Sequence, residues 1–177
     1  LSTCRISSLN EPTIALIGDS HSHALYESMA ASFADETVIN LGVWSCYPFV
    51  NEEHLERNDC SDKQALLISF LLNNPQIQTV YLAGYWGYLA SGGFAEKGNG
   101  WRLHDNITDL DADSFLANAA GFLTELQHHS RTIFLIEDVP DLDFSPLRCG
   151  DVGMPRFGDT RCSMRFEDYI ERKRQVE

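Results

Sequence analysis

The segment Thr13–His23, T-I-A-L-I-G-D-S-H-S-H, constrains the fold of this chain more than any other. An apolar run rich in β-branched residues ends abruptly at a Gly-Asp-Ser triplet, and an amphipathic helical pattern begins directly after it. Such an unbroken apolar run is typical of a strand that is buried on both faces of a parallel sheet. The segment therefore predicts a strand over 13–17, a tight turn at Ser20 and a helix over 22–33.

The rest of the chain continues this alternation of strands and helices. Further strands are expected over 37–40, 78–83 and 132–137, and further helices over 61 to about 72, 113–129 and 164–176. Ser61-Asp62-Lys63-Gln64 has the form of a capping box that would open the first of these helices. The alternation predicts an α/β fold: a three-layer α/β/α sandwich with a mainly parallel sheet, whose functional site lies at the carboxyl ends of the strands.

Composition narrows the possible functions. A chain of 177 residues with 44% hydrophobic residues suits one globular domain. Its formal net charge of −13 argues against binding nucleic acid through bulk electrostatics. No apolar stretch approaches the roughly 20 residues that a membrane-spanning helix needs.

The five cysteines are Cys4, Cys46, Cys60, Cys149 and Cys162. No C-x-x-C pair is present, which disfavours a zinc ribbon. Disulfides Cys46–Cys60 and Cys149–Cys162 would each close a short polar loop, stabilise the fold by about 3 kcal/mol and indicate an oxidising compartment. Reduced cysteines in the core are the alternative. If both disulfides form, Cys4 has no partner in this sequence.

Ser20 is the candidate nucleophile. A hydroxyl at the exit of a buried strand and the start of a helix lies near the positive end of the helix dipole and near backbone N–H groups. This environment suits attack on an acyl carbonyl and stabilisation of the resulting oxyanion. The neighbouring Asp19 is expected to accept hydrogen bonds from loop N–H groups, and His21 to brace the turn through a hydrogen bond.

The ordered motifs I-G-D-S-H, N-L-G-V-W-S-C-Y-P and V-Y-L-A-G-Y-W-G-Y resemble those of the SGNH (GDSL-like) hydrolase superfamily. The closer resemblance is to the SGNH domain fused behind type-3 membrane acyltransferases, which O-acetylate bacterial surface polysaccharides. The resemblance covers nearly the whole chain. It implies a flavodoxin-like SGNH fold in a single domain over 1–177, fused or docked to a transmembrane acyltransferase domain and located in the periplasm.

The resemblance also assigns roles to individual residues. Ser20 matches the nucleophile, and its own N–H would be one oxyanion donor. The second donor, a backbone N–H, falls on Ser45, with Gly42 as the nearby alternative. The third is normally an Asn side chain, but Trp86 occupies that position; its indole N–H could donate, or the ring could form an aromatic wall of a substrate cleft together with Tyr85.

One part of the family pattern is absent. The family's base and its orienting acid lie in an Asp-x-x-His motif near the C-terminus, and this sequence contains none. We therefore expect the C-terminal part of the domain, with the base, to lie beyond Glu177. Without that histidine Ser20 has no assigned base, although a serine needs one to react at neutral pH.

Other candidate sites are weaker. A metal at His21 and His23 is not expected, because two residues apart at a helix start their side chains diverge and no further ligands complete a set. No cofactor is expected. The long glycine-rich loop over 90–109 is interpreted either as a lid or as a plain surface loop, and its His104 as an exposed loop residue.

The function expected from the sequence is transfer of an acyl group, most simply acetyl, to a carbohydrate hydroxyl through an acyl-serine intermediate. The partners would be an acyl donor and a carbohydrate acceptor, with no nucleic acid. A stand-alone carbohydrate esterase is one alternative. A non-catalytic glycan-binding module is another, and the aromatic residues that could stack on sugar rings are Tyr85, Trp86, Tyr88 and Trp101. A flavodoxin-like nucleotide binder is disfavoured, since no glycine-rich phosphate loop follows the first strand.

Overall fold

The computed structural model describes residues 4–44, 46, 49, 59–84, 86, 112–129, 131–137, 165–167 and 170. Its elements, in chain order, are β1 (Arg5–Ile6), β2 (Ile14–Gly18), α1 (Ser20–Ser32), β3 (Val38–Asn40), α2 (Asp59–Asn73), β4 (Thr79–Ala83), α4 (Ala112–His128) and β5 (Thr132–Ile136). The predicted alternation of strands and helices, and with it the α/β class, is confirmed.

Within the described residues the strands form one five-stranded sheet in the order β1-β3-β2-β4-β5. The strands β2, β3, β4 and β5 run parallel, and β2 pairs on one side with β3 and on the other with β4. The short β1 was not predicted; it pairs antiparallel to β3 at the edge of the sheet. Because β2 is central, the turn that follows it opens at the middle of the carboxyl edge, where parallel sheets place their sites.

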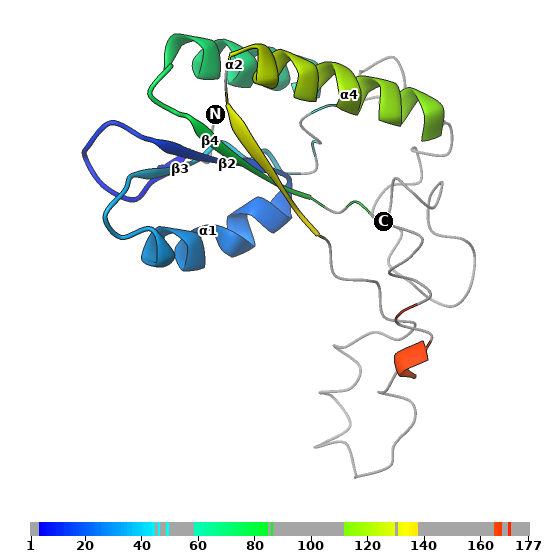
Figure 1. The fold of residues 1–177 in the computed structure, drawn as a ribbon, viewed down its shortest axis with the longest axis horizontal. Coiled ribbons are helices and arrows are strands. Elements are labelled where there is room, and N and C mark those ends of the chain that lie inside the picture. The colour runs from blue at the N-terminus through cyan, green and yellow to red at the C-terminus, as the bar shows by residue number, and fades with distance from the viewer. Residues whose placement is uncertain are drawn as a thin grey trace.

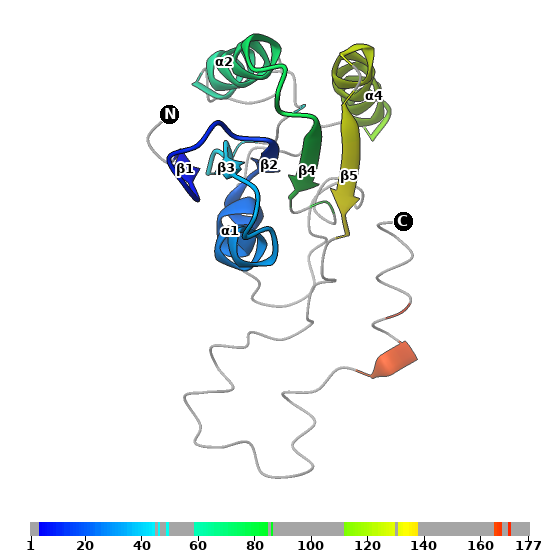
Figure 2. The same cartoon turned by 60° about the vertical axis from the view of Figure 1, so that its left-hand side comes forward.

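Helices cover both faces of the sheet (Figures 1 and 2). α1 lies on one face, and α2 and α4 lie on the other. Along β2 the side chains alternate between the two sides: Ile14 and Leu16 pack in the cluster that contains α1 residues, whereas Ala15 and Ile17 pack in the cluster that contains α2 and α4 residues. All four are at most 2% exposed, so β2 is buried on both faces as predicted.

Two helix starts differ from the predictions. α1 begins at Ser20 instead of 22, because Asp19 caps the helix: its side chain accepts a hydrogen bond from the backbone N–H of His21. α2 begins at Asp59, so Ser61 lies inside the first turn and the predicted capping box does not mark the helix start. Of the helix expected over 164–176, residues 166, 167 and 170 are helical and the others lie outside the described residues.

Gly18 makes the sharp exit from β2 possible. Its φ of 153° lies in a region that side-chain-bearing residues rarely adopt. A Cβ atom at this position would lie 1.6 Å from the carbonyl oxygen of Ala83, in the neighbouring strand β4. The glycine therefore allows β2 and β4 to stay paired up to their ends while the chain turns into Ser20.

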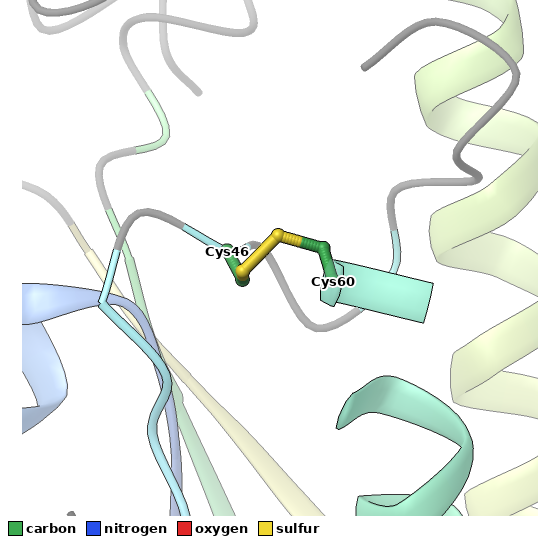
Figure 3. Close-up of a disulfide and its surroundings, with 2 residues drawn as sticks. All are labelled: Cys46 and Cys60. Carbon is green, nitrogen blue, oxygen red and sulfur yellow. A yellow bond between two sulfur atoms is a disulfide. The ribbon is translucent and has the colours of Figure 1, made fainter. Parts of the chain in front are cut away.

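A disulfide joins Cys46 to Cys60, with the two Cα atoms 5.5 Å apart (Figure 3). It connects the turn after β3 to the first turn of α2. This confirms the first of the two predicted pairs; Cys149 and Cys162 lie outside the described residues. Cys4 is exposed and unpaired within the described part of the chain.

Candidate active site

Ser20 is the first residue of α1 and is exposed at the carboxyl edge of the sheet. The first N–H groups of a helix have no acceptor within the helix and carry its partial positive charge. Among the described residues, no side chain forms a hydrogen bond with the Ser20 hydroxyl. An exposed hydroxyl at a helix N-terminus is the arrangement expected from the sequence, and it is open to a reactant.

Asp19 fixes the turn beneath this serine. It is 4% exposed. Its Oδ1 accepts a 2.8 Å hydrogen bond from the backbone N–H of His21 and lies 3.0 Å from His21 Nδ1. The expected roles of both residues are present: the Asp19 carboxylate caps the helix, and the His21 ring braces the turn. A capping carboxylate is also favourable near the positive end of the helix dipole.

A buried amide, Asn40 at the end of β3, joins three neighbouring residues. Its Oδ1 accepts a 2.8 Å hydrogen bond from the backbone N–H of Gly42 and lies 3.3 Å from the Ser22 hydroxyl. Its Nδ2 lies 3.5 Å from the Ser22 carbonyl oxygen and 3.3 Å from His23 Nδ1. Both hydrogens and the oxygen of the amide are thus used, as a side chain with 0% exposure requires.

His23 extends this network to the surface. Because its Nδ1 faces the Asn40 amide nitrogen, which can only donate, Nδ1 is assigned as the acceptor and Nε2 as the protonated atom. That tautomer lets Nε2 donate to the Gly42 carbonyl oxygen at 3.1 Å. The imidazole therefore ties the first turn of α1 to the turn after β3, and its ring lies against Trp44 with the ring centroids 5.8 Å apart.

The structure corrects the role proposed for Gly42. Its backbone N–H is bonded to Asn40 Oδ1 inside the protein, so it does not face a site above Ser20. The absence of a side chain at Gly42 instead allows the close approach of Ser22, since a Cβ atom at Gly42 would lie 1.9 Å from the Ser22 hydroxyl oxygen. Ser45, the preferred second oxyanion donor, lies outside the described residues.

The structure also corrects the role proposed for Trp86. Its indole N–H donates to the carbonyl oxygen of Ile136 at 2.8 Å, so it is not directed at a substrate oxyanion. The ring is 8% exposed and stacks on Phe49 with the centroids 5.4 Å apart. Gly84 makes this packing possible, because a Cβ there would lie 2.7 Å from the ring. The Trp86 side chain is therefore a core residue and not a cleft wall.

The remaining candidates separate into described and undescribed residues. Tyr85, Tyr88, Trp101 and His104 lie outside the described residues. Across the part of the chain that the structure describes, no group of three or more His, Cys, Asp or Glu residues could hold a metal ion. Over the same residues, no helix is long and apolar enough to cross a bilayer.

Sequence reasoning missed the Asn40 network and the exposed Trp44. The available signal was a polar residue in the apolar run V-I-N-L-G. An amide at a position that strand alternation places in the interior must be hydrogen-bonded there. Its partners were not predictable, because Ser22 and His23 are brought to it by the packing of α1 on β3.

A mainly parallel α/β sheet covered by helices on both faces, with an exposed serine at the start of the helix after its central strand, is consistent with the SGNH fold. Residues 1–177 match the family described as SGNH domain (fused to AT3 domains). The chain belongs to this family. Its members are typically serine esterases or acyltransferases, and the fusion partner is a membrane acyltransferase 3 domain, which implies an O-acyltransferase or esterase role. No curated protein matches the chain.

Proposed function

We propose that this domain transfers an acyl group, most simply acetyl, to a carbohydrate hydroxyl through an acyl-Ser20 intermediate. One observation carries the proposal: the Ser20 hydroxyl is exposed at the first position of α1 and makes no hydrogen bond within the described residues. Family membership supports the acyl chemistry. The carbohydrate acceptor and a periplasmic location follow from the resemblance to polysaccharide-modifying acyltransferases.

The chemistry proceeds in two displacements. Ser20 Oγ attacks the acyl carbonyl carbon and loses its proton to a general base; the bond from the acyl carbon to the donor breaks, and the donor leaves with a proton. The acceptor hydroxyl then attacks the acyl-serine, the Ser20 C–O bond breaks, and Oγ regains a proton. The positive end of α1 and the N–H groups of Ser20 and Ser45 would stabilise the negative oxygen in each step.

The general base is not assigned to a residue of this chain. No hydrogen bond joins the Ser20 hydroxyl to a histidine among the described residues, and the sequence contains no Asp-x-x-His. His21 is adjacent to Ser20, but its Nδ1 is turned toward Asp19. Because members of the family are fused to membrane acyltransferase 3 domains, the proposed activity is best tested in a protein that contains both domains.

Replacing Ser20 tests the proposal. In the full-length protein, Ser20→Ala is expected to lower the hydrolysis of p-nitrophenyl acetate by at least about 1,000-fold, because it removes the nucleophile. The parent protein is expected to gain the mass of one acetyl group on the peptide that contains Ser20. Ser32→Ala is the matched control: this serine lies at the other end of α1, and its hydroxyl bonds only within the helix, to Ser28.

The outcomes separate the candidate functions. Loss of turnover and adduct in Ser20→Ala alone supports the proposal. Acetyl release to water that an added oligosaccharide does not divert would favour a carbohydrate esterase. Unchanged turnover in Ser20→Ala, or an adduct on another residue, would reject the serine mechanism and leave a glycan-binding module as the better interpretation.

A further inference from the structure

We infer that Trp44 is a sugar-stacking platform against the first turn of α1, the turn that Ser20 begins. This inference rests on the proposed function and adds a residue that contacts the carbohydrate. The Trp44 side chain is 63% exposed. A tryptophan buries a large apolar surface when it packs in a core, so an indole left in solvent at the carboxyl edge of the sheet has an unused binding face. The other described tryptophan, Trp86, is 8% exposed.

The turn that carries Trp44 is held on both sides. The N–H of Val43 donates to the carbonyl oxygen of Gly18 at 2.8 Å, and the N–H of Cys46 donates to the carbonyl oxygen of Val43 at 3.1 Å. Trp44 is thus the first of the two central residues of a tight turn. The Cys46–Cys60 disulfide then fastens the end of this turn to α2 (Figure 3).

The Trp44 indole ring also packs against a second ring, that of His23. The two rings meet at an interplanar angle of 47°. The two nitrogens of that imidazole are hydrogen-bonded to Asn40 and to the Gly42 carbonyl oxygen. A ring on a closed turn, resting on a second ring that is itself anchored, loses little conformational entropy when a ligand binds.

The position of the turn connects it to the proposed nucleophile. The hydrogen bond from Val43 ends on Gly18, which is two residues before Ser20. The face of a pyranose ring presents several C–H groups, and these pack well on the electron-rich face of an indole. A sugar stacked on Trp44 would be bound through its ring, which leaves its hydroxyl or ester groups available to the serine that begins α1.

Two acetyl esters distinguish this role from a structural one. With the full-length protein, acetate release is measured from glucose pentaacetate, which has a sugar ring, and from glycerol triacetate, which has none. Trp44→Ala is expected to raise KM for glucose pentaacetate roughly tenfold with kcat within twofold, and to leave KM for glycerol triacetate unchanged. Trp44→Tyr should restore most of the lost affinity. Leu66→Ala, which removes an apolar side chain that is 57% exposed on α2, is the matched control.

A binding measurement makes the result independent of catalysis. In the Ser20→Ala protein, glucose pentaacetate is expected to quench tryptophan fluorescence, and Trp44→Phe should remove this quenching while Trp86→Phe keeps it. Equal losses of kcat/KM on both esters, or quenching that survives in Trp44→Phe, would overturn the platform. Quenching at Trp44 in a protein whose Ser20 proves dispensable would instead reject the proposed function and retain the platform.

Discussion

Two halves of the carboxyl edge of the sheet are built by different means: the turns after β2 and β3 form a polar half, and the turn after β4 forms an apolar half. The turns that follow β2 and β3 are held by polar groups, namely the Asp19 cap and the Asn40 amide. The turn that follows β4 is held mainly by apolar packing: the Trp86 ring is buried over Gly84 and against Phe49, and its indole N–H adds one hydrogen bond, to the Ile136 carbonyl oxygen. The polar side leaves a serine and an indole exposed, whereas the apolar side exposes neither face of its tryptophan.

This difference indicates where chemistry is possible. Hydrogen bonds fix backbone direction without covering the residues between them, so Ser20 and Trp44 can be held and exposed at the same time. Ring packing achieves rigidity by burial and removes the ring from the surface. Among the described residues, the candidate site therefore belongs to the β2–β3 half of the edge, whereas Trp86, after β4, packs in the core.

The largest change in stability is expected at Gly18, the residue of β2 that lies beside Ala83 of β4 and so joins the polar half of the edge to the apolar half. Gly18→Ala is expected to lower the free energy of unfolding by about 4 kcal/mol, because the new methyl group collides with the Ala83 carbonyl and the backbone conformation becomes strained. Urea denaturation measures the change. Gly121→Ala is the control: it lies inside α4 with nothing within 4 Å of the added methyl group, so a gain of roughly 0.5 kcal/mol is expected. Equal effects at the two glycines would contradict the role given to Gly18.

A smaller loss of stability is expected when Asn40, in the polar half of the edge, is replaced. Asn40→Ala leaves the Gly42 N–H and His23 Nδ1 without the amide, and a loss of about 2 kcal/mol in unfolding free energy is expected. Asn73→Ala, which removes an amide that bonds only within one turn of α2, should change stability by less than about 0.5 kcal/mol. Thermal unfolding followed by circular dichroism compares the two, and an Asn40→Ala protein as stable as its parent would show that the network is dispensable.

The smallest loss of stability is expected when Trp86, in the apolar half of the edge, is replaced by phenylalanine. Trp86→Phe keeps an aromatic ring on Phe49 but loses the hydrogen bond to Ile136, so we expect about 1 kcal/mol of destabilisation. Hydrolysis of p-nitrophenyl acetate should change less than tenfold. Removal of an oxyanion donor typically lowers the rate by about 100-fold or more. A loss of hydrolysis of that size in Trp86→Phe would show that the indole N–H is an oxyanion donor after all.

Much of this architecture could be read from local patterns. The buried strand before Ser20, the helices on either side of the sheet and the Cys46–Cys60 pair were all predicted, since each depends on the periodicity or spacing of nearby residues. The start of α2 was predicted wrongly because a capping-box pattern also occurs inside a helix. Trp86 was misassigned because a motif position does not state which way an indole points.

The sequence by itself determined the alternation of strands and helices, the class of the fold and the place of Ser20 between a buried strand and a helix. These follow from interactions within a few residues of one another. Only the tertiary structure decided the contacts of Asn40 and Trp86, because His23 lies 17 positions from Asn40 and Ile136 lies 50 positions from Trp86, so these residues meet only through packing. Hydrogen bonds and ring contacts of that kind depend on how α1, β3 and β5 are oriented in space, which no local pattern encodes.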